Sequence, residues 1–321
     1  MFFHIFTRIL SIFLIIFAGT TARKLLVLTD NAISSMARCI TNFFYPALII
    51  SSITSNFTVK SLISNWTLPV GTVLIMSVGY FIGILFSRFL EFESEKQKNT
   101  FLFQCTINNY VFLPLPIIAM LYGSKGVGFL IFSSLGSEIS VWTIGILGLT
   151  GNHIGKKNLK NLINAPIFAL IFSILIVFIR DNFGASQILT NSILKEILLS
   201  INSAIDIFGQ ASVPLALFTA GGRIYNISMK HIKTRAQLWT DFLRLILIPA
   251  AAACAILTVL PVSYEVFMVL AIVSVMPAAI VSIILSETYD ADTYFASSTV
   301  LTTHLFSLLT IPCWLTFLMN C

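Results

Sequence analysis

The sequence predicts an all-α membrane protein of ten transmembrane helices, arranged as two inverted five-helix repeats in which helices 4 and 9 are broken and cross. Three observations lead to this fold class. The composition is that of a bilayer protein, and apolar segments follow one another almost from end to end. Two of these segments are interrupted in the same way, at Asn108–Pro116 and at Met276–Ser282.

The composition excludes most soluble classes of protein. Of the 321 residues, 57% are hydrophobic and 10% are charged, and the mean hydropathy is +0.94. Soluble domains average about 25% charged residues. The net charge of +6 is therefore read as a signal of topology, and no nucleic-acid partner is expected. The five cysteines show no CxxC spacing, and no Walker A, HExxH or GxSxG motif occurs. We expect neither an enzyme nor an ATP-driven pump, and no cofactor or metal site.

Windows of about 20 apolar residues, the length that crosses a bilayer as a helix, place ten spans. The first has Arg8 ahead of its apolar run, as a signal peptide would, but is read as a retained helix because the residues before Arg23 and Lys24 make a poor cleavage site. The predicted spans are Phe3–Ala22, Ile33–Ile53, Leu68–Phe89, Thr100–Tyr122, Val127–Leu149, Leu162–Ile179, Ile197–Ala220, Leu238–Leu260, Val266–Ser286 and Phe295–Leu318.

The distribution of Lys and Arg orients the predicted bundle. The loops after spans 1, 3, 5 and 7 carry twelve of these residues, Arg223 among them, whereas the N-terminus and the loops after spans 2, 4 and 6 carry five. Cytoplasmic loops are enriched in Lys and Arg. We therefore predict a multi-pass protein of the plasma or inner membrane with both termini on the non-cytoplasmic side. The acidic loop Glu287–Asp292 is then cytoplasmic although it contains neither Lys nor Arg.

Two landmarks indicate an internal repeat. Pro46 in the second span corresponds to Pro214 in the seventh at an offset of 168, and Asn108 corresponds to Pro277 at an offset of 169. Both offsets relate each span to the span five positions later. Because each repeat then has an odd number of spans, the second half crosses the membrane in the opposite orientation to the first. The predicted units are residues 1–152 and 153–321. Broken helices at corresponding places in two halves indicate the binding site of a secondary transporter.

The broken helices contain the predicted substrate site. A helix that restarts inside the bilayer has free N–H groups and a partial positive charge at its new N-terminus, which favour an anion. We expect the restarts at Asn109 and at Pro277, and the Asn109 amide can both cap the helix and hold a carboxylate. Two proline-kinked structural helices are the alternative. The predicted substrate-binding residues are Asn108, Asn109, Pro116, Pro277, Ala278, Ser282 and Ser51.

Ionisable residues inside spans are the candidates for ion or proton coupling, because a charge in the bilayer is costly. Glu138 lies in the fifth span, His304 in the tenth and Asp206 in the seventh. A neutral packing role is the alternative, and coupling to Na⁺ or H⁺ stays open. Three other charged residues are predicted to extend to the cytoplasmic interface: Arg38, Asp241 and Arg244.

The two interruptions resemble motifs of the auxin efflux carrier family. Asn109–Pro116 is similar to the fourth-helix pattern of that family, and Pro277–Ser282 to its ninth-helix signature. In this chain Tyr110 and Val111 stand where the family has Thr and Gly. The family includes plant PIN-FORMED carriers and bacterial carriers described as malate or malonate permeases. The resemblance covers nearly the whole chain and implies a ten-helix carrier with an intramembrane crossover and an organic-anion substrate.

We therefore expect a secondary active or facilitative transporter that moves small organic anions, specifically carboxylates, by alternating access. The alternatives are a Na⁺-coupled symporter of the bile-acid-carrier type, a cation/proton antiporter and a receptor that does not transport. The expected partners are the organic acid and the lipid bilayer. The sequence leaves open whether the chain forms a homodimer.

Overall fold

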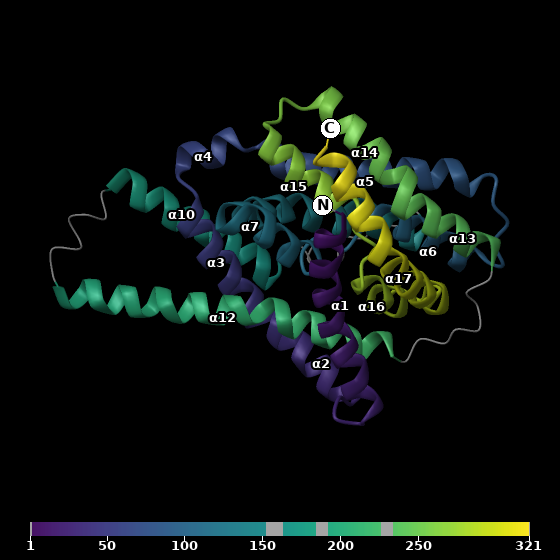
Figure 1. The fold of residues 1–321 in the computed structure, drawn as a ribbon, viewed down its shortest axis with the longest axis horizontal. Coiled ribbons are helices and arrows are strands. Elements are labelled where there is room, and N and C mark those ends of the chain that lie inside the picture. Colours follow the sequence, from purple (N-terminus) through teal and green to yellow (C-terminus); the bar gives the residue numbers. More distant parts are fainter. Residues whose placement is uncertain (1, 152–162, 184–191, 226–233, 321) are drawn as a thin grey trace.

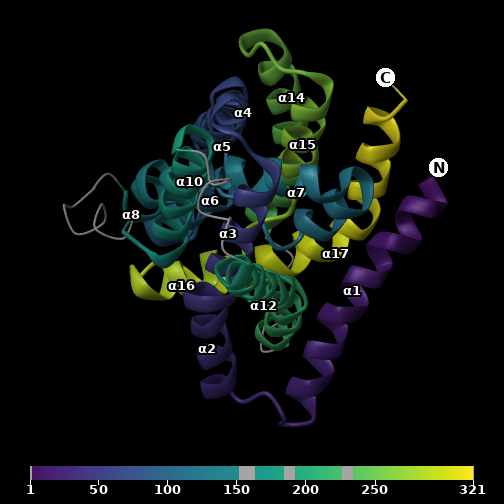
Figure 2. The ribbon, with the colours of Figure 1, turned by 90° about the vertical axis from the view of Figure 1, so that its left-hand side faces the viewer.

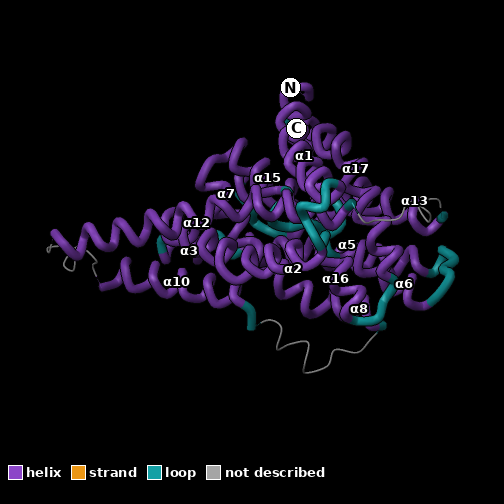
Figure 3. Tube along the Cα trace, turned by 90° about the horizontal axis from the view of Figure 1, so that it is seen from below, coloured by secondary structure: helices purple, strands orange, loops and turns teal. Residues whose placement is uncertain are grey.

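The regular structure of the chain is helical. The computed structural model describes residues 2–151, 163–183, 192–225 and 234–320. Within these ranges there is no β-strand, and the one β-type pairing is an isolated bridge (Figures 1 and 3). In the described part of the chain, eight helical segments are long and apolar enough to cross a membrane. The predicted all-α class is confirmed, whereas the predicted boundary between two five-helix units, at 152–153, lies outside the described residues.

Seven of the ten predicted spans are single helices or helices that continue directly into one another. The prefix η denotes a π-helical turn, and the short helix α4 (Val59–Ser64) precedes α5. The seven spans are formed by α1 (Phe2–Lys24), α2–η1–α3 (Asp30–Cys39, Ile40–Phe44 and Tyr45–Asn56), α5 (Thr67–Ser87), α10 (Ala165–Phe183), α12 (Ser192–Ile224), α13–η4–α14 (Arg235–Phe242, Leu243–Leu247 and Ile248–Val259) and α17 (Thr293–Leu318).

The fifth predicted span is the second part of a longer helical segment. Helix α7 (Pro114–Ser140) continues through η2 (Val141–Gly145) into α8 (Ile146–Thr150). It bends at Gly123, where φ is 61° and ψ is −155°. Glycine adopts a positive φ without the steric cost that a side chain imposes. The bend therefore separates the fourth span from the fifth at the position that the sequence predicts.

The fourth and ninth predicted spans are interrupted. Helix α6 (Glu95–Thr106) is followed by the non-helical residues 107–113, after which α7 begins. Helix α15 (Tyr264–Ser274) is followed by residues 275–280, after which α16 (Val281–Thr288) begins. We call residues 107–113 the first break and residues 275–280 the second break. Both predicted interruptions are present.

The helices restart later than the sequence predicts. Helix α7 begins at Pro114 and not at Asn109, and α16 begins at Val281 and not at Pro277. Proline is favourable at the first position of a helix, because its φ is already helical and its missing N–H would have no intrahelical acceptor there. Pro114 therefore marks the start of α7, whereas the residues around Asn109 are extended because they pair with the second break.

The two breaks pair through their main chains. The backbone N–H of Asn109 donates to the carbonyl of Pro277 at 2.8 Å, and that of Ala279 donates to the carbonyl of Ile107 at 3.3 Å. These bonds form the antiparallel β-bridge. Non-helical backbone at membrane depth must find hydrogen-bond partners inside the protein. Each break supplies partners for the other, so the two interruptions, far apart in sequence, form one crossover.

Glycines allow α1 and α12 to contact each other closely (Figure 1). A Cβ atom at Gly221 would lie 1.8 Å from the carbonyl oxygen of Ile16, and one at Gly19 would lie 1.9 Å from that of Phe218. Thr20 also donates its hydroxyl to the Gly221 carbonyl at 3.0 Å. Small residues permit such close packing of membrane helices. This contact fixes the last turns of α12, which border the cavity described below.

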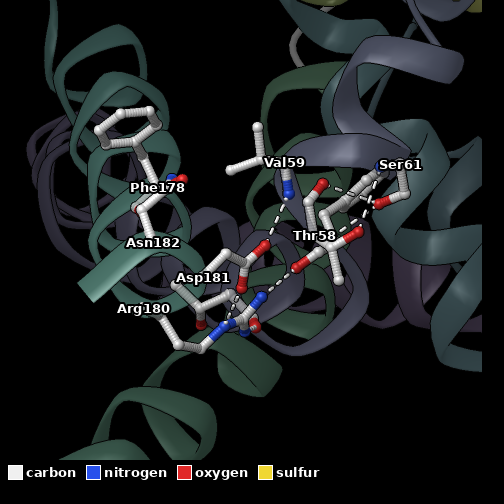
Figure 4. Close-up of polar contacts among 9 residues, drawn as sticks. Thr58, Val59, Ser61, Phe178, Arg180, Asp181 and Asn182 are labelled. Atoms are coloured by element: carbon white, nitrogen blue, oxygen red, sulfur yellow. Dashed lines mark hydrogen bonds and ion pairs between the residues drawn. The ribbon is translucent and has the colours of Figure 1, made fainter. Parts of the chain in front are cut away.

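The end of α10 holds the turn between α3 and α4 (Figure 4). The Arg180 guanidinium donates to the carbonyls of Thr54 at 2.6 Å and Phe57 at 2.5 Å, where α3 ends. The Asp181 carboxylate accepts from the backbone N–H of Val59 at 2.8 Å, where α4 begins. These contacts match the partial charges of the two helix ends. An open surface pocket of about 430 Å³ adjoins this turn.

Loops that the sequence assigns to one side of the membrane lie together. Lys96 pairs with Asp290 at 2.7 Å, and both belong to loops that follow odd-numbered spans. Lys125 pairs with Glu265 at 2.5 Å, and both belong to loops that follow even-numbered spans. The free ends of α1 and α17 lie at the same end of the molecule (Figure 2). Which of the two sides faces the cytoplasm stays a prediction.

Candidate functional site

A cavity of about 340 Å³ lies beside the crossover. It is lined by side chains from both breaks and from α1, α2, η1, α3, α7, η2, α10, α12 and α16, and most of them are apolar. A mainly apolar cavity with a few polar groups is the usual form of a small-molecule site. The polar side chains on its wall are Thr41, Tyr45, Asn108, Asn109, Tyr110, Glu138, Trp142, Asn164, Thr219 and Arg223.

Two of these side chains, a guanidinium and a carboxyl group, have charged forms of opposite sign. Arg223 lies in the last turn of α12 and Glu138 lies near the end of α7. Sequence reasoning counted Arg223 as a loop charge and missed it as a wall residue. The signal was present, because Ala216, Ala220 and Arg223 follow one another at spacings of four and three residues, which places them on one face of a helix. All three border the cavity.

Glu138 is held by neutral hydrogen-bond donors. Its Oε1 accepts from the hydroxyl of Tyr110 at 2.9 Å, and its Oε2 accepts from the amide of Asn164 at 3.2 Å. Hydrogen bonds to an ionised acceptor are stronger than those between neutral groups. Tyr110, which departs from the family motif, thus connects the first break to the acid. The carboxylate of Glu138 is oriented by the protein before any ligand enters the cavity.

The two asparagines of the first break have different environments. Asn108 is fully buried, and its Nδ2 donates to the carbonyl of Val273, near the end of α15. Its Oδ1 has no hydrogen-bond partner among the described residues. Asn109 is 8% exposed, and its Oδ1 accepts from the backbone N–H of Leu113 at 3.4 Å. Leu113 directly precedes α7, so this amide contributes to the helix start, although the helix begins later than predicted.

His304 lies behind Asn109 and does not border the cavity. Its Nδ1 lies 2.7 Å from the carbonyl of Val300. A carbonyl only accepts, so Nδ1 carries the hydrogen and Nε2 is free to accept. Nε2 is 3.4 Å from Nδ2 of Asn109. The neutral imidazole therefore accepts a hydrogen bond from the Asn109 amide and orients it.

The other residues predicted to bind substrate in the broken helices lie within the crossover itself. Pro116 is half-buried in the first turn of α7, and Pro277 supplies the carbonyl that accepts from the first break. The N–H of Ala278 donates to the Thr303 hydroxyl at 3.3 Å. The Ser282 hydroxyl accepts from the amide of a buried glutamine on α6 at 3.0 Å. None of these four predicted residues is on the cavity wall.

Ser51 and Asp206 form a separate contact between α3 and α12. The Ser51 hydroxyl donates to Asp206 at 2.8 Å, and Gln210 donates to the other carboxylate oxygen at 2.7 Å. Asp206 is exposed and borders a different surface from the cavity. Of the ten residues predicted to bind substrate or ions, the structure brings together Asn108, Asn109 and Glu138 on the cavity wall.

Arg244 connects the two broken helices. Its guanidinium is completely buried and donates to the carbonyl of Cys105 at 3.0 Å and to that of Ser274 at 2.8 Å. These carbonyls lie in the last turns of α6 and α15, where helix dipoles place partial negative charge. The prediction that Arg244 and Asp241 extend to the interface is wrong, because both side chains are buried. The breaks create free carbonyls inside the bundle that accept from Arg244.

Comparison with known proteins identifies the family. The family model described as "Membrane transport protein" matches residues 4–315. The chain belongs to this membrane transport family. The resemblance to the auxin efflux carrier family is thus confirmed, and the chain is a member of a family of membrane transporters.

Two archaeal relatives agree with this assignment. One is an uncharacterized transporter of Methanocaldococcus jannaschii, 25% identical over 321 residues, which covers 97% of this chain and 98% of the relative. The other is an uncharacterized transporter of Methanothermobacter thermautotrophicus, 24% identical over 311 residues, which covers 95% of this chain and 96% of the relative. The similarity therefore extends over nearly the full length of each chain and spans both breaks.

Proposed function

We propose that this protein is a ten-helix carrier of two inverted repeats that moves small carboxylates across the cell membrane by alternating access. The cavity beside the crossover is its substrate site, and both termini face the non-cytoplasmic side. The observation that carries the proposal is the position of Arg223, a cation on the wall of a mainly apolar cavity that also contains the Asn109 amide.

Arg223 suits one carboxylate. A guanidinium can donate two parallel hydrogen bonds to a carboxylate, which gives both affinity and orientation. The body of the anion would then lie against the apolar side chains of α12 and α16, such as Leu217 and Ile284. This chemistry favours an organic acid with an apolar part over an inorganic anion.

The paired breaks support alternating access. In carriers with inverted repeats, one part of the molecule rocks against another around a site formed by discontinuous helices. Here the main-chain bonds between Asn109, Pro277, Ile107 and Ala279 link the breaks of the two predicted repeats directly. A movement of one break is therefore transmitted to the other, next to the cavity.

Arg223→Gln tests the proposal in the purified protein. We expect wild-type proteoliposomes to exchange one or more acids from a labelled carboxylate panel. Losing a hydrogen bond to a charged group costs about 1.5–3 kcal/mol, so the affinity of Arg223→Gln should fall by roughly ten- to a hundredfold. Arg38→Gln, an exposed arginine on α2, is the matched control and should bind as the wild type does. A wild type that exchanges no carboxylate refutes the function.

Asn109 provides a second test of the same site. Asn109→Ala should weaken carboxylate binding to a similar extent, because one amide donor beside the cavity is lost. Asn109→Asp should weaken it further, since a like charge would face the anion. Calorimetry on the purified variants measures both affinities. Wild-type affinity in both variants would mean that the crossover is structural and that the anion binds elsewhere.

A further inference from the structure

We propose that Asp241 is the proton-binding residue of this carrier and that α17 transmits its protonation to both breaks. The proposal rests on the proposed transport function and names its coupling ion. Asp241 lies on α13 and is only 5% exposed. It is distinct from the three acids and bases that the sequence suggests for coupling.

The Asp241 carboxylate belongs to a buried polar cluster between α13 and α17. Its Oδ1 accepts from the amide of Gln237 at 3.0 Å and from the hydroxyl of Thr302 at 2.7 Å. The Gln237 Oε1 in turn accepts from Ser298 at 2.9 Å and Thr299 at 3.1 Å. The Oδ2 of Asp241 is buried and has no hydrogen-bond partner among the described residues. Oδ1 thus accepts two hydrogen bonds, whereas Oδ2 can still accept one.

No cation neutralises this carboxylate in the part of the chain that the structure describes. No Lys, Arg or His nitrogen there lies within 4.0 Å of its oxygens. Arg244, one turn later, donates to the two helix-end carbonyls instead. The titratable groups on α13 and on the elements packed against it, together with the cap of α17, are Arg235, Arg244, Glu95, Lys96, Lys98, Cys105, Asp292, Tyr294, His304 and Cys313.

A proton is the ligand that this geometry accepts. A buried carboxylate without a counter-charge is destabilised by the loss of hydration. Transfer of one proton from water to Oδ2 forms an O–H bond and removes the negative charge, and release of the proton restores it. The Oδ1 hydrogen bonds from Gln237 and Thr302 can persist in both states. A bound Na⁺ would need several oxygen ligands, whereas the open acceptor on this residue is the single atom Oδ2.

Three consecutive residues of α17 connect this acid to the crossover. Thr302 donates to Asp241. The next residue, Thr303, accepts from the backbone N–H of Ala278 in the second break at 3.3 Å. The following residue, His304, contacts the Asn109 amide in the first break. One turn of a helix thus touches the acid and both breaks. A change of charge at Asp241 acts on Thr302, and a resulting shift of α17 reaches both breaks together.

Asp241→Asn separates proton coupling from substrate binding, because the amide oxygen can still accept from Gln237 and Thr302. Two rates are measured in proteoliposomes: carboxylate exchange without a pH gradient, and uptake driven by a gradient of about one pH unit, which supports about tenfold accumulation per proton. We expect the variant to keep exchange and to lose the accumulation. Glu196→Gln, an exposed acid on α12, is the control and should keep both.

Each outcome bears on a different claim. A wild type that exchanges carboxylates without any pH-driven accumulation overturns the proton site, and so does an Asp241→Asn variant that still accumulates. Loss of accumulation in Glu138→Gln or Asp206→Asn, with Asp241→Asn unaffected, moves the site to that acid. If Asp241→Asn loses exchange as well, the pH profile of uptake is measured for Thr302→Val, which removes one hydrogen bond to Asp241. A profile displaced from that of the wild type supports the proposal, and an unchanged profile overturns it. A wild type without exchange refutes the proposed function itself.

Discussion

The contact between α1 and α12 predicts a measurable loss of stability in Gly221→Ala. The new methyl carbon would lie 1.8 Å from the carbonyl oxygen of Ile16, whereas ordinary contact begins at 3.4 Å, so the shortfall is about 1.6 Å. Both contacting groups are tied to helix backbone, so no side chain can rotate away and the helices must separate. Overpacking of this kind costs about 1–3 kcal/mol. Alanine also gains up to about 1 kcal/mol over glycine in a helix interior, which opposes the loss.

A matched variant isolates the contact from the helix propensity. Gly148→Ala makes the same substitution in α8, where the nearest atom would be an ordinary 3.4 Å away. Thermal unfolding of both variants in detergent, followed by tryptophan fluorescence, measures the difference. We expect the Tm of Gly221→Ala to be about 2–10 °C below that of Gly148→Ala, on the usual relation between stability and Tm. Equal Tm values would refute the close packing of α1 on α12.

Two further predictions concern the crossover and the topology. Arg244→Met should lower the Tm more than Arg244→Lys. Methionine leaves two buried carbonyls without a donor, at a cost of about 1–3 kcal/mol each, whereas lysine keeps a positive charge beside them. Equal Tm values for the wild type and Arg244→Met would contradict this role of Arg244. Single cysteines in place of Lys96 and Lys125 should react with an impermeant thiol reagent from opposite sides of the membrane, the cysteine at position 96 from the cytoplasmic side. Labelling of both positions from one side would refute the predicted order of spans.

The breaks illustrate how much of the fold the sequence predicts. Asn108 and Pro277 interrupt apolar runs, and their positions are a local property that can be read from the chain alone. The predicted restarts at Asn109 and Pro277 are wrong, because the main chain at these residues is bonded to the other break and the helices begin only at Pro114 and Val281. Such pairing joins residues that are far apart in sequence. The conformational propensities of nearby residues do not indicate where this pairing stops and the next helix begins.

The site shows the same division. Glu138 was identified from sequence because a carboxylate inside an apolar span is unusual. Arg223 and Arg244 were assigned to a loop and an interface, because sequence alone does not reveal that α12 extends past Arg223 or that two broken helices end beside Arg244. The sequence by itself determined the all-α membrane class, the family and the two interruptions, which depend on composition and local chemistry. Only the tertiary structure decided which polar groups share a cavity and which lie buried without a counter-charge, since these depend on contacts between distant helices.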